Sequence, residues 1–338
     1  MESALIDSHL DRYWVQAGKN TDEDLHFSEL YRRADRELGY KNALYFYTNF
    51  SEEYYFDTNE HKSTQRRIVI EVTNSLDKLS LLVCNIVDLS TQLGKPTQAE
   101  ELTASLASGD RRRLLHWYRN NMMLHYRLYR YSRKLEATDR IEEALTKRLD
   151  ELPTDKMPTT LFDADTLRKL EDGLAFESEY LTLFEDILVQ MGARTEQVNT
   201  VEKFLMLMQP ELRSSVEAYI GNWQHLYYHG YRARYSSGPQ KIRERLWRDF
   251  RESKTSGQLG CKIVKDEDQT AAPENDEQEP FYPILQAAKV FRRLCQLRNF
   301  RNLDRFLDHT ARNCGCSEWE LRCLRPHELL RVMRGDAR

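Results

Sequence analysis

Glycine and proline are scarce in this chain, which has 13 glycines and 9 prolines among 338 residues. Sandwiches, barrels and propellers need more of both, because their many tight turns depend on these residues. Cysteine is rare too, and the 6 cysteines are too irregularly spaced for a disulfide scaffold. The composition therefore predicts a helical globular protein in a reducing intracellular compartment, either the cytosol or the interior of an organelle.

Long apolar segments are also absent. The longest stretch without a charged residue, Ala218–Tyr231, has 14 residues and includes two histidines, so it is too short and too polar to span a bilayer. The first 25 residues have neither the apolar core of a secretory signal nor the arginine-rich composition of a transit peptide. We expect a protein that does not span a membrane and has no cleavable presequence, while import into an organelle such as the mitochondrion by another signal stays open.

Two long segments, from about 63 to 93 and from about 111 to 152, have apolar residues spaced alternately three and four apart. This repeat is typical of long helices that cross at small angles, as in bundles and coiled coils. Between them, Thr97 and Glu100 form a capping box and Gly109 a helix stop, which predicts a short reversing helix. Further helices are expected near 165–190, 201–209, 211–235, 240–254, 284–313 and 318–334.

These patterns predict an all-α fold, in which a long antiparallel helical hairpin or bundle is extended by a helical C-terminal module. The two long helices should pack along one seam. The residues expected on this seam are Val69, Val72, Leu76, Leu79, Val83 and Ile86 on the first helix, and Leu124, Leu128, Tyr131 and Leu135 on the second.

The segment Tyr40–Asp57 is the exception to the helical pattern. It is rich in aromatic residues, as strands are, but polar and apolar residues alternate poorly along it. A packed irregular connection is therefore our first interpretation, and a β-hairpin is the second.

Composition divides the chain into four expected regions. Residues 255–283 are acidic and contain prolines, which is typical of a linker that cannot bury enough apolar surface to fold. The four regions are an N-terminal extension at 1–60 with one helix and the aromatic segment, a long-helix bundle at 61–254, the acidic linker at 255–283, and a basic helical module at 284–338.

Two cationic segments, Arg111–Lys134 and Arg232–Lys254, contain interleaved aromatic residues. Arginine and tyrosine together are typical of protein–protein contacts, and cations beside aromatics also suit single-stranded RNA. The sequence pI near 6.2 lacks the basic bias of RNA-binding proteins, and the neighbouring segments 135–192 and 255–283 offer acidic partners. The candidate partner-contact residues are Arg119, Tyr126, Arg127, Tyr129, Arg130, Arg232, Arg234, Trp247 and Arg248.

Metal and catalytic motifs are not recognised in the sequence. His309, Cys314, Cys316, Cys323 and His327 cluster near the C-terminus, but a single residue separates Cys314 from Cys316, which does not suit the paired spacing of zinc ligands. The pair at 225 and 229 lacks the glutamate of an H-E-x-x-H site, and neither a dinucleotide-binding nor a phosphate-binding glycine loop occurs. We therefore expect no catalytic residues, no cofactor and no metal.

The absence of catalytic motifs and the blocks of opposite charge favour a protein that acts through contacts. Residues 1–60 have a net charge of −7 and residues 110–134 one of +7. The sequence predicts a non-catalytic accessory or scaffold subunit of a large multiprotein assembly, such as a mitochondrial complex. The alternatives are an RNA-binding subunit of a ribonucleoprotein such as a ribosome, and a helical enzyme with an unrecognised site.

Overall fold

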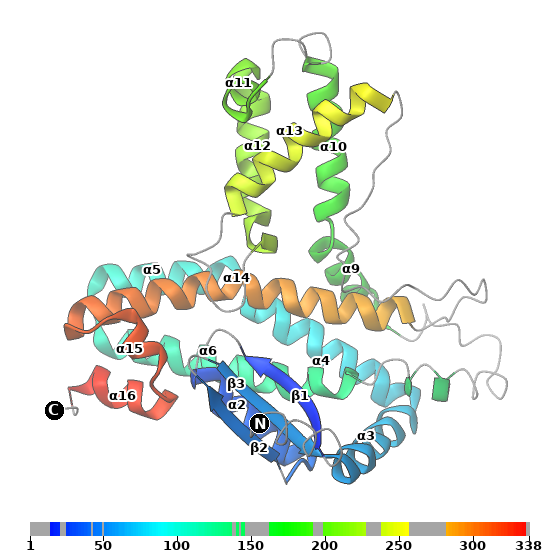
Figure 1. Ribbon diagram of the computed structural model, residues 1–338, viewed down its shortest axis with the longest axis vertical. Coiled ribbons are helices and arrows are strands. Elements are labelled where there is room, and N and C mark those ends of the chain that lie inside the picture. Colours follow the sequence, from blue (N-terminus) through cyan, green and yellow to red (C-terminus); the bar gives the residue numbers. More distant parts are fainter. Residues whose placement is uncertain are drawn as a thin grey trace, which may run out of the picture. The chain divides into compact units, whose positions relative to one another are not determined.

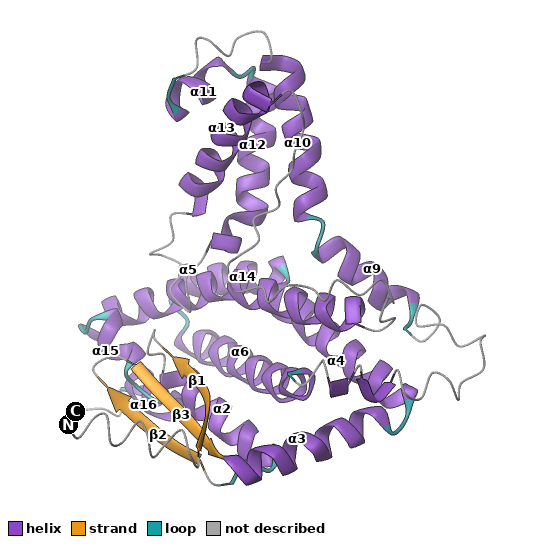
Figure 2. Cartoon of the chain, turned by 45° about the vertical axis from the view of Figure 1, so that its right-hand side comes forward, coloured by secondary structure: helices purple, strands orange, loops and turns teal. Residues whose placement is uncertain are grey.

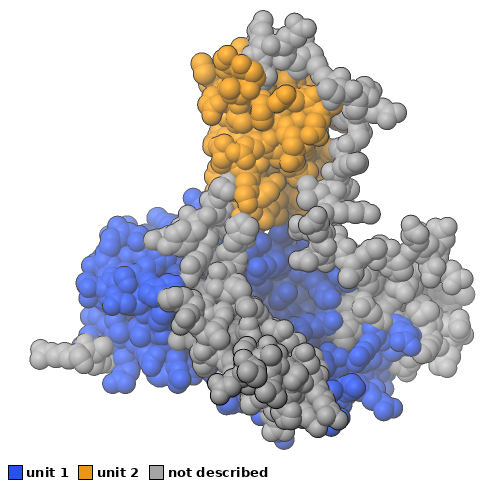
Figure 3. All heavy atoms as spheres, viewed as in Figure 1, with its two compact units in different colours: residues 1–170, 230–234, 280–338 blue, residues 171–229, 235–279 orange. Residues whose placement is uncertain are grey.

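The computed structural model describes residues 14–20, 25–41, 43–48, 51–136, 140–141, 143–145, 162–191, 199–227, 238–256 and 282–335. It is predominantly helical, as predicted (Figure 1). The chain forms two compact units, coloured separately in Figure 3. Unit 1 comprises Met1–Leu170, Gly230–Arg234 and Pro280–Arg338, and unit 2 comprises Glu171–His229 and Tyr235–Glu279.

A small antiparallel sheet lies near the N-terminus of unit 1 (Figure 2). Its strands are β1 (Trp14–Asn20), β2 (Ala43–Thr48) and β3 (Ser51–Asp57), in the order β1-β3-β2, and helix α2 (Leu25–Leu38) connects the first two. Strands β2 and β3 form a hairpin, so the irregular connection that we expected at 40–57 is wrong and the second interpretation is correct. The strand propensity of the aromatic residues outweighed their poor alternation.

The first long helix of the prediction is two helices in the structure, α3 (Thr58–Thr73) and α4 (Leu76–Gly94). Between them Ser75 is extended, with φ −149°. Asparagine and serine, at 74 and 75, are residue types that favour caps and turns over helix interiors. The seven-residue spacing continues through this break, because Val72 and Leu79 are both buried. Periodicity alone therefore could not reveal it.

Helix α5 (Pro96–Ser108) reverses the chain between α4 and α6 (Arg111–Ser132), as predicted. The predicted capping box of Thr97 and Glu100 is wrong, because the helix begins at Pro96 and its N-cap residue is Lys95. Gly109 ends α5 in the left-handed conformation at φ 62°, and the Asp110 carboxylate caps the first turn of α6. Helix α6 ends well before residue 152 and continues only into a short 3-10 turn, η1 (Arg133–Leu135).

The predicted seam between the two long helices is present in part. Helix α4 packs along α6, and the seam residues of α4 from Leu79 onward are buried. Leu128 and Leu135 are buried as well. Val72, on α3, is also buried. The remaining four members are only half-buried: Val69, Leu76, Leu124 and Tyr131.

The C-terminal segment is part of unit 1 and not a separate module, which corrects the predicted region at 284–338. Helix α14 (Tyr282–Cys314) packs along α4 and α5, and is followed by α15 (Glu318–Arg322) and α16 (Pro326–Arg334). Helix α14 is buried on most of its sides. Its many arginines made the segment read as a basic surface module, although its apolar residues belong to the core of unit 1. Its buried apolar residues include Leu285, Phe291, Leu297, Phe300, Leu303, Phe306 and Leu307.

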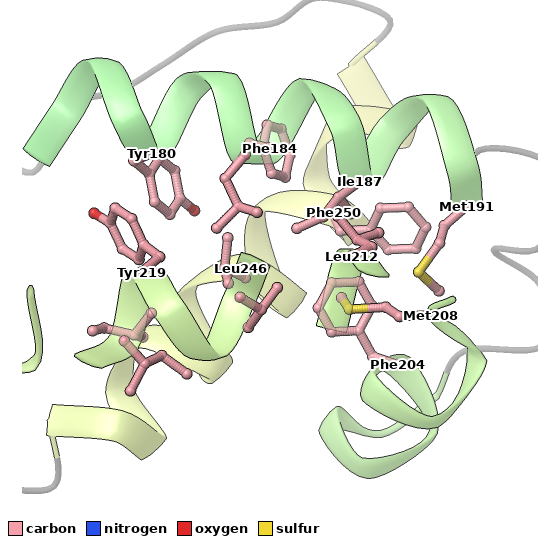
Figure 4. Close-up of a cluster of buried hydrophobic side chains, with 14 of the residues drawn as sticks. Tyr180, Phe184, Ile187, Met191, Phe204, Met208, Leu212, Tyr219, Leu246 and Phe250 are labelled. Carbon is pink, nitrogen blue, oxygen red and sulfur yellow. The ribbon is translucent and has the colours of Figure 1, made fainter. Parts of the chain in front are cut away.

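Unit 2 is a helical unit with its own core (Figure 4). Its helices are α10 (Phe176–Met191), α11 (Val201–Leu207), α12 (Pro210–Trp223), the 3-10 turn η3 (Gln224–Tyr227) and α13 (Gly238–Ser256), while α9 (Ala164–Gly173) crosses the boundary between the units. The bundle predicted at 61–254 is thus divided between two units, because the side chains of α10, α12 and α13 pack on one another. The linker centre at 257–281 lies outside the described residues.

A buried polar cluster joins α4, α6 and α14. The Asn299 side chain on α14 donates to the carbonyl of Leu93 on α4 at 3.2 Å. Its oxygen accepts from Asn121 Nδ2 at 3.0 Å and from His125 Nε2 at 3.1 Å, both on α6. One amide therefore satisfies polar groups of three helices in the core, where leaving them unbonded would cost about 1–3 kcal/mol each.

Close packing of α4 on α14 generates the first prediction. A Cβ atom at Gly94 would lie 3.1 Å from Cys295 Sγ and 3.2 Å from its Cβ, so Gly94→Ala should lower the free energy of unfolding by about 1–3 kcal/mol. The control is Gly221→Ala in α12, where the added methyl group meets open space and should raise helix stability by up to about 1 kcal/mol. Denaturant unfolding of both variants measures this, and equal effects would contradict the close approach.

The enclosure of His125 generates a pH dependence. Burial lowers the pKa of His125 from 6.5 to about 4, so between these values the unfolded chain binds a proton that the folded chain excludes. The free energy of unfolding should therefore fall as pH drops from 6.5 towards 4, by about 3 kcal/mol from this group. His125→Gln should remove that part of the slope in denaturant titrations over this range. An unchanged slope would show that His125 takes no part.

Candidate functional site

Helix α6 has one buried face and one exposed face. The buried face includes Leu114, Trp117, Asn121, His125 and Leu128, which pack in the core of unit 1. On the opposite face the exposed residues recur three and four apart, the spacing of one helix side. We call this set the α6 stripe: Arg112, His116, Arg119, Met123, Arg127 and Arg130.

Two of the sequence-predicted contact residues, Tyr126 and Tyr129, are core residues. The Tyr129 ring stacks on Tyr31 with 3.9 Å between ring centroids, and its hydroxyl donates to Asp35 at 3.4 Å. Tyr126 is buried beside α2, with the Arg33 guanidinium 5.1 Å from its ring centroid. The expectation that these tyrosines meet a partner is therefore corrected, because contact with α2 already buries them.

The cations at the C-terminal end of α6 have partners within unit 1. Arg133 and Asp35 form a buried ion pair at 3.1 Å, and Arg130 lies 3.5 Å from Glu37 at the surface. Burial raises the pKa of Asp35, and the Arg133 charge opposes this rise. Acidic partners thus come from α2 in the N-terminal region, and Arg133 also pairs with Glu136 in the segment after α6 that the sequence had suggested.

The other arginines of the α6 stripe have no such partner. Within the part of the chain that the structure describes, Arg112, Arg119 and Arg127 form no ion pair. They span 16 residues along one helix face, or about 22 Å. The Met123 side chain lies between Arg119 and Arg127 and is 52% exposed.

A hollow of about 400 Å³ adjoins the N-terminal end of the stripe, where α5 and α6 meet. It is lined by Glu101, Ala104, Ser105, Arg112, Arg113 and His116. Sequence reasoning missed Arg112, His116 and Met123 because it followed the aromatic residues. The helical phase set by the buried Leu114, Trp117 and Leu128 would have placed all three on the exposed face.

The second cationic segment is largely neutralised inside unit 2. In α13, Arg248 lies 3.4 Å from Asp249, and the half-buried Trp247 ring lies 5.0 Å from the Arg251 guanidinium. Arg243 pairs with Glu217 of α12 at 2.9 Å. Two further candidates, Arg232 and Arg234, lie outside the described residues.

The histidine and cysteine clusters do not assemble a metal site among the residues described. No three His, Cys, Asp or Glu side chains there are arranged to hold an ion. His225 is buried in unit 2, and residue 229 is not described. Cys314 and Cys323 are exposed, and Cys316 is partly covered.

Comparison with known proteins assigns no family to this chain. Neither a protein-family model, nor a curated protein, nor a solved structure matches it. In the described ranges, no helix has the length and apolar character needed to cross a membrane. The candidate site is therefore characterised by its own residues, which form an exposed cationic face on α6.

The division between stripe and core generates the next prediction. Tyr129→Ala should lower the free energy of unfolding by about 3–5 kcal/mol, because it removes a buried ring stacked on Tyr31. Arg119→Ala and Arg127→Ala should change it by no more than about 0.5 kcal/mol, because both side chains are exposed and unpaired. Denaturant unfolding tests this contrast. A large loss from either arginine variant would show that the stripe is structural.

Proposed function

We propose that the protein is a non-catalytic accessory or scaffold subunit of an intracellular multiprotein assembly, and that the α6 stripe binds an acidic segment of another subunit. The observation that carries this proposal is the row of exposed arginines at 112, 119 and 127, which form no ion pair with any described residue. Arginine binds carboxylates through two parallel hydrogen bonds, and arginine and methionine are enriched at protein interfaces. The proposed assembly includes the case of an organellar complex, such as a mitochondrial one.

The burial of the aromatic residues favours a protein partner over RNA. Single-stranded RNA is bound by stacking bases on exposed rings, with cations beside them. In α6 the rings of Trp117, Tyr118, Tyr126 and Tyr129 are all buried, which leaves the stripe with charge but without these stacking platforms. The cationic row would still attract phosphates, so an RNA-binding subunit of a ribonucleoprotein is the second candidate.

The test compares two triple charge reversals. Arg112→Glu, Arg119→Glu and Arg127→Glu together reverse the stripe. The control reverses Arg36, Arg66 and Arg301, which are also exposed and without an ion pair in the described structure but lie on three different helices. Both variants change the net charge equally, but only the first reverses the charge of one continuous surface.

The stripe variant should lose the protein subunits that co-purify with the native chain, as measured by quantitative mass spectrometry, while the control retains them. The native chain should also lose these co-purifying subunits as the salt concentration is raised, because screening weakens exposed charge pairs. Equal retention by both variants would contradict the proposal. Loss of a component that ribonuclease also removes, with strong absorbance at 260 nm, would establish the RNA alternative instead.

A further inference from the structure

Cys314 and Cys316 flank Gly315, the residue that directly follows helix α14. Cys314 is the last residue of α14, and Gly315 follows in the left-handed conformation at φ 67°. The Cys316 N–H then donates to the carbonyl of Ala311 at 3.2 Å, the bond that closes a Schellman turn. The chain therefore folds back at Gly315 and does not extend between the two cysteines.

This turn brings the two cysteines within reach of each other. Consecutive Cα atoms are about 3.8 Å apart, so residues two apart are separated by less than about 7.6 Å, and a tight turn shortens this towards the roughly 4.4–6.8 Å of disulfides. Cys314 is exposed and Cys316 is partly exposed, so both sulfurs are open to a small reagent. Burial raises the pKa of Cys316, and the neighbouring Cys314 and Glu320 raise it further.

The cysteines of the core are in different surroundings. Cys295 is buried where α14 packs on Gly94, and its burial raises the pKa of its thiol to about 12. Cys84 is hydrogen-bonded to Asp163 at 3.1 Å, and burial raises its pKa as well. Neither position has a second cysteine within two residues along the chain, so neither belongs to a closely spaced pair of thiols.

We propose that Cys314 and Cys316 are a redox-active dithiol that closes to an intramolecular disulfide by exchange with a small disulfide such as glutathione disulfide. The Cys314 thiolate attacks one sulfur of glutathione disulfide, and one glutathione leaves and takes up a proton. The Cys316 thiolate then attacks the Cys314 sulfur of the mixed disulfide, and the second glutathione leaves in the same way. Both cysteines are oxidised, and one glutathione disulfide is reduced to two glutathiones.

The exposed position of the pair allows the disulfide to form and to be reduced again. Exposed disulfides in reducing compartments are readily reduced, and those that form there are mostly transient or redox-sensing. The turn leads directly into the capping box of Ser317 and Glu320 that begins α15. Helix α15 carries Arg322, which forms buried ion pairs with Asp304 and Glu318. Closing the disulfide would fix the turn that delivers this arginine to the core.

The test uses the full chain, reduced and then incubated with increasing ratios of glutathione disulfide to glutathione. Free thiols are blocked with N-ethylmaleimide and the protein is digested with trypsin. Cleavage after Arg312 and Arg322 releases peptide 313–322, which contains both cysteines of the pair and no other. Cys323 falls on the next peptide and serves as an internal control.

Oxidised protein should yield peptide 313–322 lighter by two hydrogen atoms, with neither glutathione nor N-ethylmaleimide attached, while Cys323 does not join this disulfide. Cys314→Ser and Cys316→Ser should each stop at a mixed glutathione disulfide on the remaining cysteine, and Cys323→Ser should behave as the unmodified chain. Accumulation of the mixed disulfide in the unmodified chain, a bond to Cys323, or full alkylation at every ratio would overturn the proposal.

Discussion

The side chain of Asn299 holds together the first unit of this protein. Its amide bonds Leu93, Asn121 and His125, so a slip of α4, α6 or α14 along its neighbours would break hydrogen bonds between buried polar groups. Apolar packing alone would tolerate small slips of one helix along another. Gly94 reinforces the register, because Cys295 of α14 occupies the space that a side chain at this position of α4 would need.

The exposed surface of α6 follows from this internal constraint. Once Asn121 and His125 point towards α14, the helical repeat directs residues 112, 119 and 127 to the opposite side. Helix α2 fixes the remaining side through the buried pair of Asp35 and Arg133, which is adjacent to the stacked rings of Tyr31 and Tyr129. Among the described residues of unit 1, the neighbours of α6 thus leave the cationic stripe uncovered.

Charge in this chain has two different roles. Cations such as Arg133 and Arg322 are buried, and each is paired with carboxylates, as desolvated charges must be. On the stripe, Arg112, Arg119 and Arg127 are exposed and form no ion pair with any residue that the structure describes. Net charge counted along the sequence adds both kinds together. It could therefore indicate a contact surface in 110–134 but could not separate the exposed arginines of this segment from the buried Arg133.

By itself the sequence determined the local structure: the helical class, the helix stop at Gly109, and the reversal through α5 between α4 and α6. These depend on residues within a few positions of one another, where propensity and capping act directly. Only the tertiary structure decided that α14 belongs to unit 1, that the helices from α10 to α13 form a unit of their own, and that Tyr126 and Tyr129 are buried. Each of these depends on contacts between segments far apart in the chain. A local pattern of apolar residues predicts that one face of a helix is buried, but it does not predict which other helix covers that face.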